Sequence, residues 1–169
     1  MKATELHAEI KENLKDYPIE YLRNKVTDDR YKDPLTKSLA KYNSEAWDEI
    51  FAMKITEDYD IKDGVVENIK ADIDFYFDTY AGGDEETREF TKYISLYLAL
   101  MAKRPLHPVG EDPIKDQVFL ENGEYKCKSR IMSIKDERSL CRYCICKNAG
   151  YSFGFYLRLE NAELYNGAL

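Results

Sequence analysis

The chain has 169 residues, and its 25 lysines and arginines stand against 32 aspartates and glutamates, which gives a net charge of −7 with neutral histidines. Apolar residues make up 44% of the chain and aromatic residues 13%. This composition excludes an intrinsically disordered protein and supplies enough apolar material for a buried core. The length is typical of a single domain with at most a small second module.

Three features of the chain predict a cytoplasmic protein. Residues 1–17 alternate charged with single apolar residues and lack the uninterrupted apolar core of a secretory signal. The longest apolar stretch, 93–102, falls well short of the ~20 residues that a membrane-spanning helix needs. All four cysteines lie between Cys127 and Cys146, whereas a disulfide framework ties distant parts of a secreted chain together. We therefore expect free thiols and no contact with a membrane.

Up to residue 104, apolar residues recur three or four positions apart, which is typical of amphipathic helices. The first stripe begins just after Thr4, which we expect to cap the first helix. Asp33 and Pro34 predict the cap and the first turn of another helix, and a separate helix is expected around Trp47. Two longer helices follow, the second of them capped by Asp84. This pattern predicts a bundle-like helical region over residues 1–104.

After residue 104 the pattern changes, because prolines and glycines become frequent and the apolar residues come closer together. Asn122 and Gly123 stand between two short apolar stretches, and this dipeptide favours a type I′ hairpin turn. Residues 151–159 alternate apolar and polar side chains, which predicts a half-buried strand, although a terminal helix is the alternative. We expect a small α+β module over residues 105–169, packed on the helices of a mainly α-helical protein.

The cysteines of this module are the strongest functional signal in the sequence. Cys141 and Cys144 form a Cys-x-x-Cys pair, a spacing that lets one tight turn direct two thiolates at the same ion. With Cys127 and His107 they supply three sulfurs and one imidazole, which is the donor set of a closed tetrahedral zinc site. Cys146 offers a four-sulfur alternative without His107. We favour the histidine, because Cys144 and Cys146 would have to turn toward one metal across a single residue.

Other interpretations of the cysteines remain open. Four ordinary reduced cysteines would need no metal, but their clustering argues against this. A thioredoxin-like redox pair lacks the expected βαβ pattern before Cys141. An iron–sulfur cluster on Cys127, Cys141, Cys144 and Cys146 is the remaining alternative to zinc. Its colour would distinguish it from zinc.

Three short motifs in this region carry a resemblance to a known family. They are the His-Pro-Val-Gly segment 107–110, the Tyr-x-Cys sequence that ends at Cys127, and the Leu-Cys-Arg-Tyr-Cys-Ile segment 140–145. Here the sequence resembles an uncharacterised family of archaeal proteins, found mainly in methanogens and catalogued as a domain of unknown function. The resemblance implies a helical N-terminal region followed by this Cys/His module, and an archaeal cytoplasm as its setting. It implies no activity.

Basic residues gather around the cysteines. Between Lys126 and Lys147, seven lysines and arginines face two acidic residues, a balance of +5 in a chain that is acidic as a whole. One interpretation is nucleic-acid binding, in which basic and aromatic side chains contact phosphates and stack on bases. Its candidate residues are Arg138, Arg142, Tyr143 and Lys147. The interpretation that we favour is that cations offset the negative charge of a thiolate-rich metal site.

No established catalytic motif is present: the sequence lacks His-Glu-x-x-His, a phosphate-binding Gly-Lys-Ser/Thr loop and Gly-x-Ser-x-Gly. The function that we favour is a non-enzymatic binding or adaptor protein, with a structural zinc ion and an unidentified protein partner. Nucleic-acid binding through the basic module is the second hypothesis. The third is a metal-dependent enzyme, with water at the fourth metal position and Glu111, Asp112 or Asp116 as the base.

Overall fold

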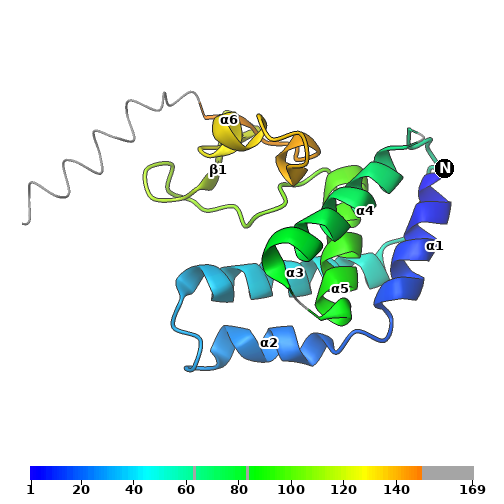
Figure 1. Ribbon diagram of the computed structural model, residues 1–169, viewed down its shortest axis with the longest axis horizontal. Helices are drawn as coiled ribbons and strands as arrows, with labels where there is room; N and C mark the ends of the chain where they lie inside the picture. The colour runs from blue at the N-terminus through cyan, green and yellow to red at the C-terminus, as the bar shows by residue number, and fades with distance from the viewer. Residues whose placement is uncertain (63, 83, 150–169) are drawn as a thin grey trace, which may run out of the picture.

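The computed structural model describes residues 1–62, 64–82 and 84–149. The fold is mainly helical, as the sequence predicts, with one small sheet near the end of the described chain (Figure 1). The helices of the first part are α1 (Ala3–Leu14), α2 (Ile19–Thr27), α3 (Pro34–Ala52), α4 (Val65–Tyr76) and α5 (Glu85–Leu96). Helix α4 continues into a π-helical turn, η1 (Phe77–Ala81), and α5 continues into another, η2 (Tyr97–Met101).

Two of the predicted helix caps are confirmed. The carboxylate of Asp33 accepts hydrogen bonds from the backbone amides of Leu35 and Thr36 at 3.2 and 3.0 Å, at the start of α3. The carboxylate of Asp84 accepts one from the amide of Thr87 at 2.7 Å, at the start of α5. Both side chains satisfy amides that have no partner within the helix.

The predicted cap at Thr4 is wrong, because α1 begins earlier, at Ala3. The carboxylate of Glu5 turns back to accept from the amide of Lys2 at 2.7 Å. The amide and the hydroxyl of Thr4 both donate to Asp58, which lies far away in the sequence. A separate helix around Trp47 is also wrong, since Trp47 belongs to the continuous helix α3.

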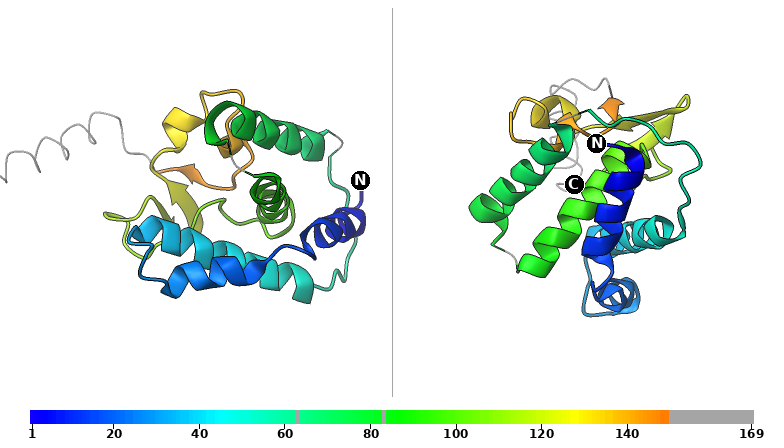
Figure 2. Two further views of the ribbon diagram at one scale, coloured as in Figure 1. Left: turned by 60° about the horizontal axis from the view of Figure 1, so that its bottom comes forward. Right: turned by 90° about the vertical axis from the view of Figure 1, so that its right-hand side faces the viewer.

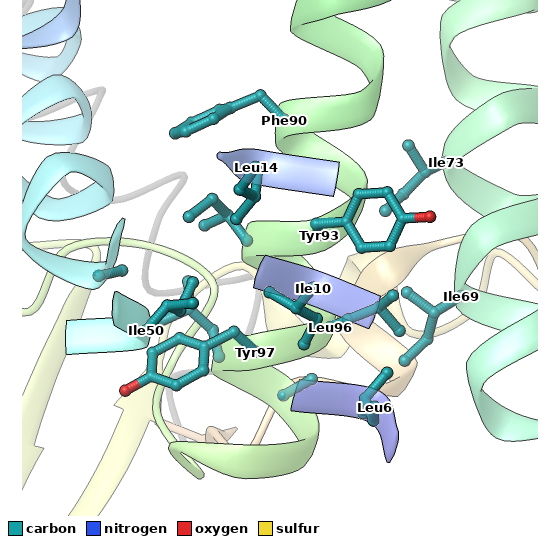
Figure 3. Close-up of a cluster of buried hydrophobic side chains, with 14 of the residues drawn as sticks. Leu6, Ile10, Leu14, Ile50, Ile69, Ile73, Phe90, Tyr93, Leu96 and Tyr97 are labelled. Carbon is teal, nitrogen blue, oxygen red and sulfur yellow. The ribbon is translucent and has the colours of Figure 1, made fainter. Parts of the chain in front are cut away.

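Helix α5 lies in the middle of the helical region, and the left view of Figure 2 looks along it with α1, α3 and α4 around it. Its inward side chains meet those of the three neighbours in one hydrophobic core (Figure 3). All four helices contribute fully buried side chains to this core. They include Leu6, Ile10 and Leu14 of α1, Ile50 of α3, Ile69 and Ile73 of α4, and Leu96 of α5. The apolar faces that the helical periodicity of the sequence predicts therefore pack around α5.

The chain then builds a three-stranded sheet of β1 (Val118–Glu121), β2 (Glu124–Cys127) and β3 (Lys147–Asn148). Strands β1 and β2 form an antiparallel hairpin, and β3 pairs with β2 in parallel. Asn122 and Gly123 have φ angles of +52° and +77°, as the predicted type I′ turn requires. Two short helices, α6 (Arg130–Ser133) and the 3₁₀ turn η3 (Leu140–Arg142), lie between β2 and β3.

Residues 105–149, called the cysteine segment below, lie against the helical region. The hydroxyl of Tyr42 donates to the carbonyl oxygen of Pro105 at 2.7 Å, and Leu140 and Tyr143 pack against the core of the helices. The boundary predicted at residues 104 and 105 stays a prediction. The strand or helix predicted over 151–159 lies outside the described residues. Within the described ranges, no helix is both long enough and apolar enough to span a bilayer.

Candidate functional site

Three of the four cysteines meet in one small buried cluster. Cys127 ends β2 and Cys146 precedes β3, and their exposed fractions are 9% and 2%. Val118 belongs to the same buried cluster, and Cys144, which is half-buried, packs against this cluster. These thiols come from two short segments, the end of β2 and the residues just before β3. They are free thiols, as is Cys141.

The strand register explains why these thiols meet. Val118 lies directly opposite Cys127 in the hairpin, so the two side chains share one face of the sheet. In the parallel pair, Cys127 lies opposite Asn148. Cys146 precedes Asn148 by two positions and therefore lies on the same face as Cys127.

The turn η3 carries Cys141, the first cysteine of the Cys-x-x-Cys pair, and Cys144 follows it; Arg130 contacts the backbone of both cysteines. Its guanidinium donates hydrogen bonds to the carbonyl oxygens of Cys141 and Cys144, the latter at 3.1 Å. The side chain of Ser139 accepts from the amide of Cys141 at 3.3 Å, at the start of the turn. One positive side chain thus contacts the backbone at both ends of the pair.

The surroundings of Cys144 stabilise a thiolate there. The hydrogen bond from the thiol of Cys146 lowers the pKa of Cys144 to about 5, and the backbone amides of Cys146 and Leu106 and the charge of Arg130 act in the same direction. The same hydrogen bond and burial raise the pKa of Cys146. The two shifts run in opposite directions, so Cys144 is the more acidic thiol of the pair. The side chains of Cys144 and Cys146 thus approach each other, although a single residue separates them along the chain.

A cavity of about 720 Å³ lies between the cysteine segment and helices α3, α4 and α5. The predicted ligands His107, Cys127, Cys141 and Cys144 all line it, as does Cys146. As the side chains stand, no group of three or more His, Cys, Asp or Glu residues among the described residues is arranged to hold a metal ion. The structure thus brings the predicted ligands to one cavity without placing them around a common centre.

Two of the candidate nucleic-acid-binding residues, Arg138 and Tyr143, contact helix α4. Nε of Arg138 lies 2.7 Å from a carboxylate oxygen of Asp72, and the guanidinium also donates to the carbonyl oxygen of Ala71 at 3.0 Å. The same guanidinium lies 4.1 Å from the centre of the Phe75 ring. The hydroxyl of Tyr143 donates to the other oxygen of Asp72 at 2.9 Å.

The other two candidates also form contacts within the chain. The guanidinium of Arg142 donates to the carbonyl oxygen of Glu137. The ammonium of Lys147 pairs with the carboxylate of Glu124. The cluster of basic residues in the sequence thus corresponds to several separate intramolecular contacts.

The carboxylates that were candidate bases belong to a loop of their own. The carboxylate of Asp116 accepts from the amide of Asp112 at 2.8 Å, and that of Asp112 accepts from the amide of Ile114 at 2.8 Å. Glu111 is exposed in the same loop. Of the described residues that line the cavity, none is one of these three carboxylates.

Sequence reasoning missed two residues of this region, Arg130 and Asp72. Arg130 is one of seven basic residues nearby, and its sequence position does not distinguish it from the others. Asp72 belongs to an acidic stretch with Asp74 and Asp78, which is typical of a solvated helix face. In the structure Asp72 is only 7% exposed. No pattern in the neighbouring sequence predicts its contacts with Arg138 and Tyr143.

Comparisons with known proteins assign the chain to a family. A family model described as an uncharacterized protein conserved in archaea (DUF2115) matches residues 2–149. A UPF0305 protein of Methanocaldococcus jannaschii is 28% identical over 160 residues, which cover 88% of this chain and 97% of that protein. No solved structure matches the chain. Because the family model spans the helices and the whole cysteine segment, the chain belongs to this family of uncharacterised archaeal proteins, DUF2115.

Proposed function

We propose that this protein is a non-enzymatic binding or adaptor protein whose cysteine segment is held together by a structural zinc ion. The observation that carries the proposal is the buried cluster of Cys127, Cys144 and Cys146, in which separate segments bring thiols together. Thiolates and imidazoles are the donors that zinc prefers in closed structural sites. Free thiols and zinc also fit a reducing cytoplasm, where we place the protein.

The ligand set follows from the cavity lining. Cys127, Cys144 and Cys146 supply three thiolates, and Cys141 or His107 supplies the fourth donor, since both line the same cavity. Zinc binds cysteine as the thiolate, so binding would release the thiol protons of these ligands. A site with four protein donors leaves no open position for a reacting water. An iron–sulfur cluster on the four cysteines is the competing occupant.

The cysteine segment has the size of structure that a metal ion stabilises. Its strands are four, four and two residues long, and its buried cluster of Val118, Cys127 and Cys146 is small. So little buried apolar surface contributes little free energy of folding. Metal binding would add directly to that free energy.

The decisive experiment measures the zinc content and the melting temperature of the full chain purified anaerobically. We expect one zinc per chain, and Cys144→Ser or Cys127→Ser should remove the metal and lower the melting temperature by about 5–10 °C. Comparing Cys141→Ser with His107→Gln identifies the fourth ligand. His7→Gln is the matched control, because His7 contacts the carbonyl oxygen of Ile50 within the helices. It should leave the zinc content unchanged.

A wild-type chain without bound metal would contradict the proposal, as would a Cys144→Ser variant that loses zinc but keeps its melting temperature. A coloured protein with bound iron would replace zinc by an iron–sulfur cluster. A titration with RNA and single-stranded DNA over a salt series tests the nucleic-acid hypothesis, since phosphate contacts strengthen at low salt. Arg138, Tyr143 and Lys147 already have partners within the chain, so we expect little binding.

A further inference from the structure

Asp72 is a buried carboxylate of helix α4, and two residues of the cysteine segment, Arg138 and Tyr143, contact it. Its side chain is 10% exposed, and one oxygen lies 2.7 Å from Nε of Arg138. The other oxygen accepts from the hydroxyl of Tyr143 at 2.9 Å. We call these contacts of Asp72 with Arg138 and Tyr143 the Asp72 junction. A buried carboxylate without such partners would be strongly unfavourable.

The two partners lie on either side of the turn η3, which carries Cys141. Tyr143 lies between Cys141 and Cys144, and Arg138 precedes Cys141 by only three positions. The ring of Tyr143 also packs against the core of the helices. The junction is therefore a direct connection between the thiol site and helix α4.

Little secondary structure holds this turn in place. The 3₁₀ turn η3 has three residues, and short 3₁₀ turns are weakly stable by themselves. A metal ion bound to the flanking thiolates would fix the backbone on both sides of Tyr143. Fixing that backbone also fixes the hydroxyl that contacts Asp72. Metal binding and the contacts of Asp72 would therefore stabilise each other.

We infer that metal binding at the thiol cluster and docking of the cysteine segment on helix α4 are one linked equilibrium, with Asp72 as the positioning residue on the helical side. This inference rests on the proposed zinc site and adds its regulation. Linkage is reciprocal: a contact that forms better in the zinc-bound state must raise the affinity for zinc by the same factor. Asp72 thus influences a site whose ligands it does not touch.

The test is zinc affinity, measured on the full chain by competition with a chromogenic chelator. We expect Asp72→Asn to weaken zinc binding about tenfold and Tyr143→Phe about threefold. Asp74→Asn is the matched control, because Asp74 follows Asp72 by two positions on the same helix but pairs with Lys92 of α5, at 3.0 Å. Its zinc affinity should stay within about twofold of the wild type.

Amide hydrogen exchange of α4 provides a second readout that a merely structural role would not move. Zinc should slow exchange in α4 of the wild type and of Asp74→Asn, and should slow it much less in Asp72→Asn. If Asp72→Asn fails to fold, Tyr143→Phe and Arg138→Gln take its place. The side chain of Arg138 is 45% exposed, and its loss should be tolerated.

The outcomes separate this inference from the proposed function. A wild-type chain that binds no zinc overturns both. A wild-type chain that binds zinc, with Asp72→Asn, Tyr143→Phe and Arg138→Gln binding it equally well, overturns the linkage and leaves the structural zinc site standing. Weakened binding in these variants together with an equal loss in Asp74→Asn also overturns it, because general destabilisation would then explain the effect.

Discussion

At the residue scale, Arg130 shows how one side chain can organise a cysteine pair without being a ligand. Its guanidinium contacts the carbonyl oxygens of Cys141 and Cys144, and its charge helps to lower the pKa of Cys144. A cation near several thiolates offsets their mutual repulsion. That basic residues offset the charge of a metal site stays a prediction, and the structure shows contacts of Arg130 with the backbone of the cysteine pair.

Replacing Arg130 by methionine should therefore lower the free energy of unfolding by about 1.5–3 kcal/mol, because two carbonyl oxygens lose a charged donor. Urea denaturation of the full chain measures this. Lys128→Met is the matched control, since the ammonium of Lys128 donates to the carbonyl oxygen of Ile114 at 2.6 Å and lies over the Phe119 ring. Equal losses in the two variants would show that Arg130 has no special role.

At the element scale, the pairing of β3 with β2 spans only two residues on each strand. Glu124 supports it from outside the ladder, because its carboxylate pairs with Lys147 of β3 and with Lys126 of β2. Hydrogen bonds from Lys147 and Lys126 lower the pKa of Glu124 from its ordinary value of 4.5 to about 2. The ionised carboxylate therefore connects the turn end of β2 with Lys147, the residue that follows Cys146.

The lowered pKa of Glu124 sets a pH dependence with a defined sign. Its contribution to stability is fully present above about pH 4.5 and is lost as the pH falls toward 2, because protonation removes the ion pairs. An NMR titration of the Glu124 carboxyl carbon should show a midpoint near pH 2. Amide exchange at Lys147 should accelerate over the same range, and Glu124→Gln should abolish this acceleration. A midpoint near 4.5 would contradict the prediction.

At the scale of the whole molecule, one core unites the helices and also receives the cysteine segment. Leu96 of the central helix α5 is fully buried in this core, whereas Leu140 and Tyr143 pack against it from the cysteine segment. Packing at this core therefore supports both the helical region and the surface on which the segment docks.

Leu96→Ala tests the central place of α5. We expect it to lower the free energy of unfolding by about 2–5 kcal/mol, through lost burial and the cavity left behind. Equilibrium urea unfolding followed by circular dichroism is the measurement. Leu35→Ala is the control, because Leu35 is 59% exposed and should change stability by less than about 0.5 kcal/mol. Similar effects of the two substitutions would refute the arrangement.

Much of the local structure could be predicted from the sequence, because local chemistry causes it. Asp33 and Asp84 cap helices by bonding amides two or three residues away, and Asn122 and Gly123 form the type I′ turn through their own φ angles. The prediction failed at Thr4, where a distant partner, Asp58, decides the contact.

The sequence by itself determined the helical character, the hairpin and the region in which the thiols lie, since periodicity, turn chemistry and spacing act between neighbours in the chain. Only the tertiary structure decided that Cys146 joins Cys144 and Cys127, and that Tyr143 contacts Asp72. Asp72 and Tyr143 are 71 residues apart in sequence. Contacts of this kind depend on how α4 and the parallel strand β3 are placed in space, which no local pattern specifies.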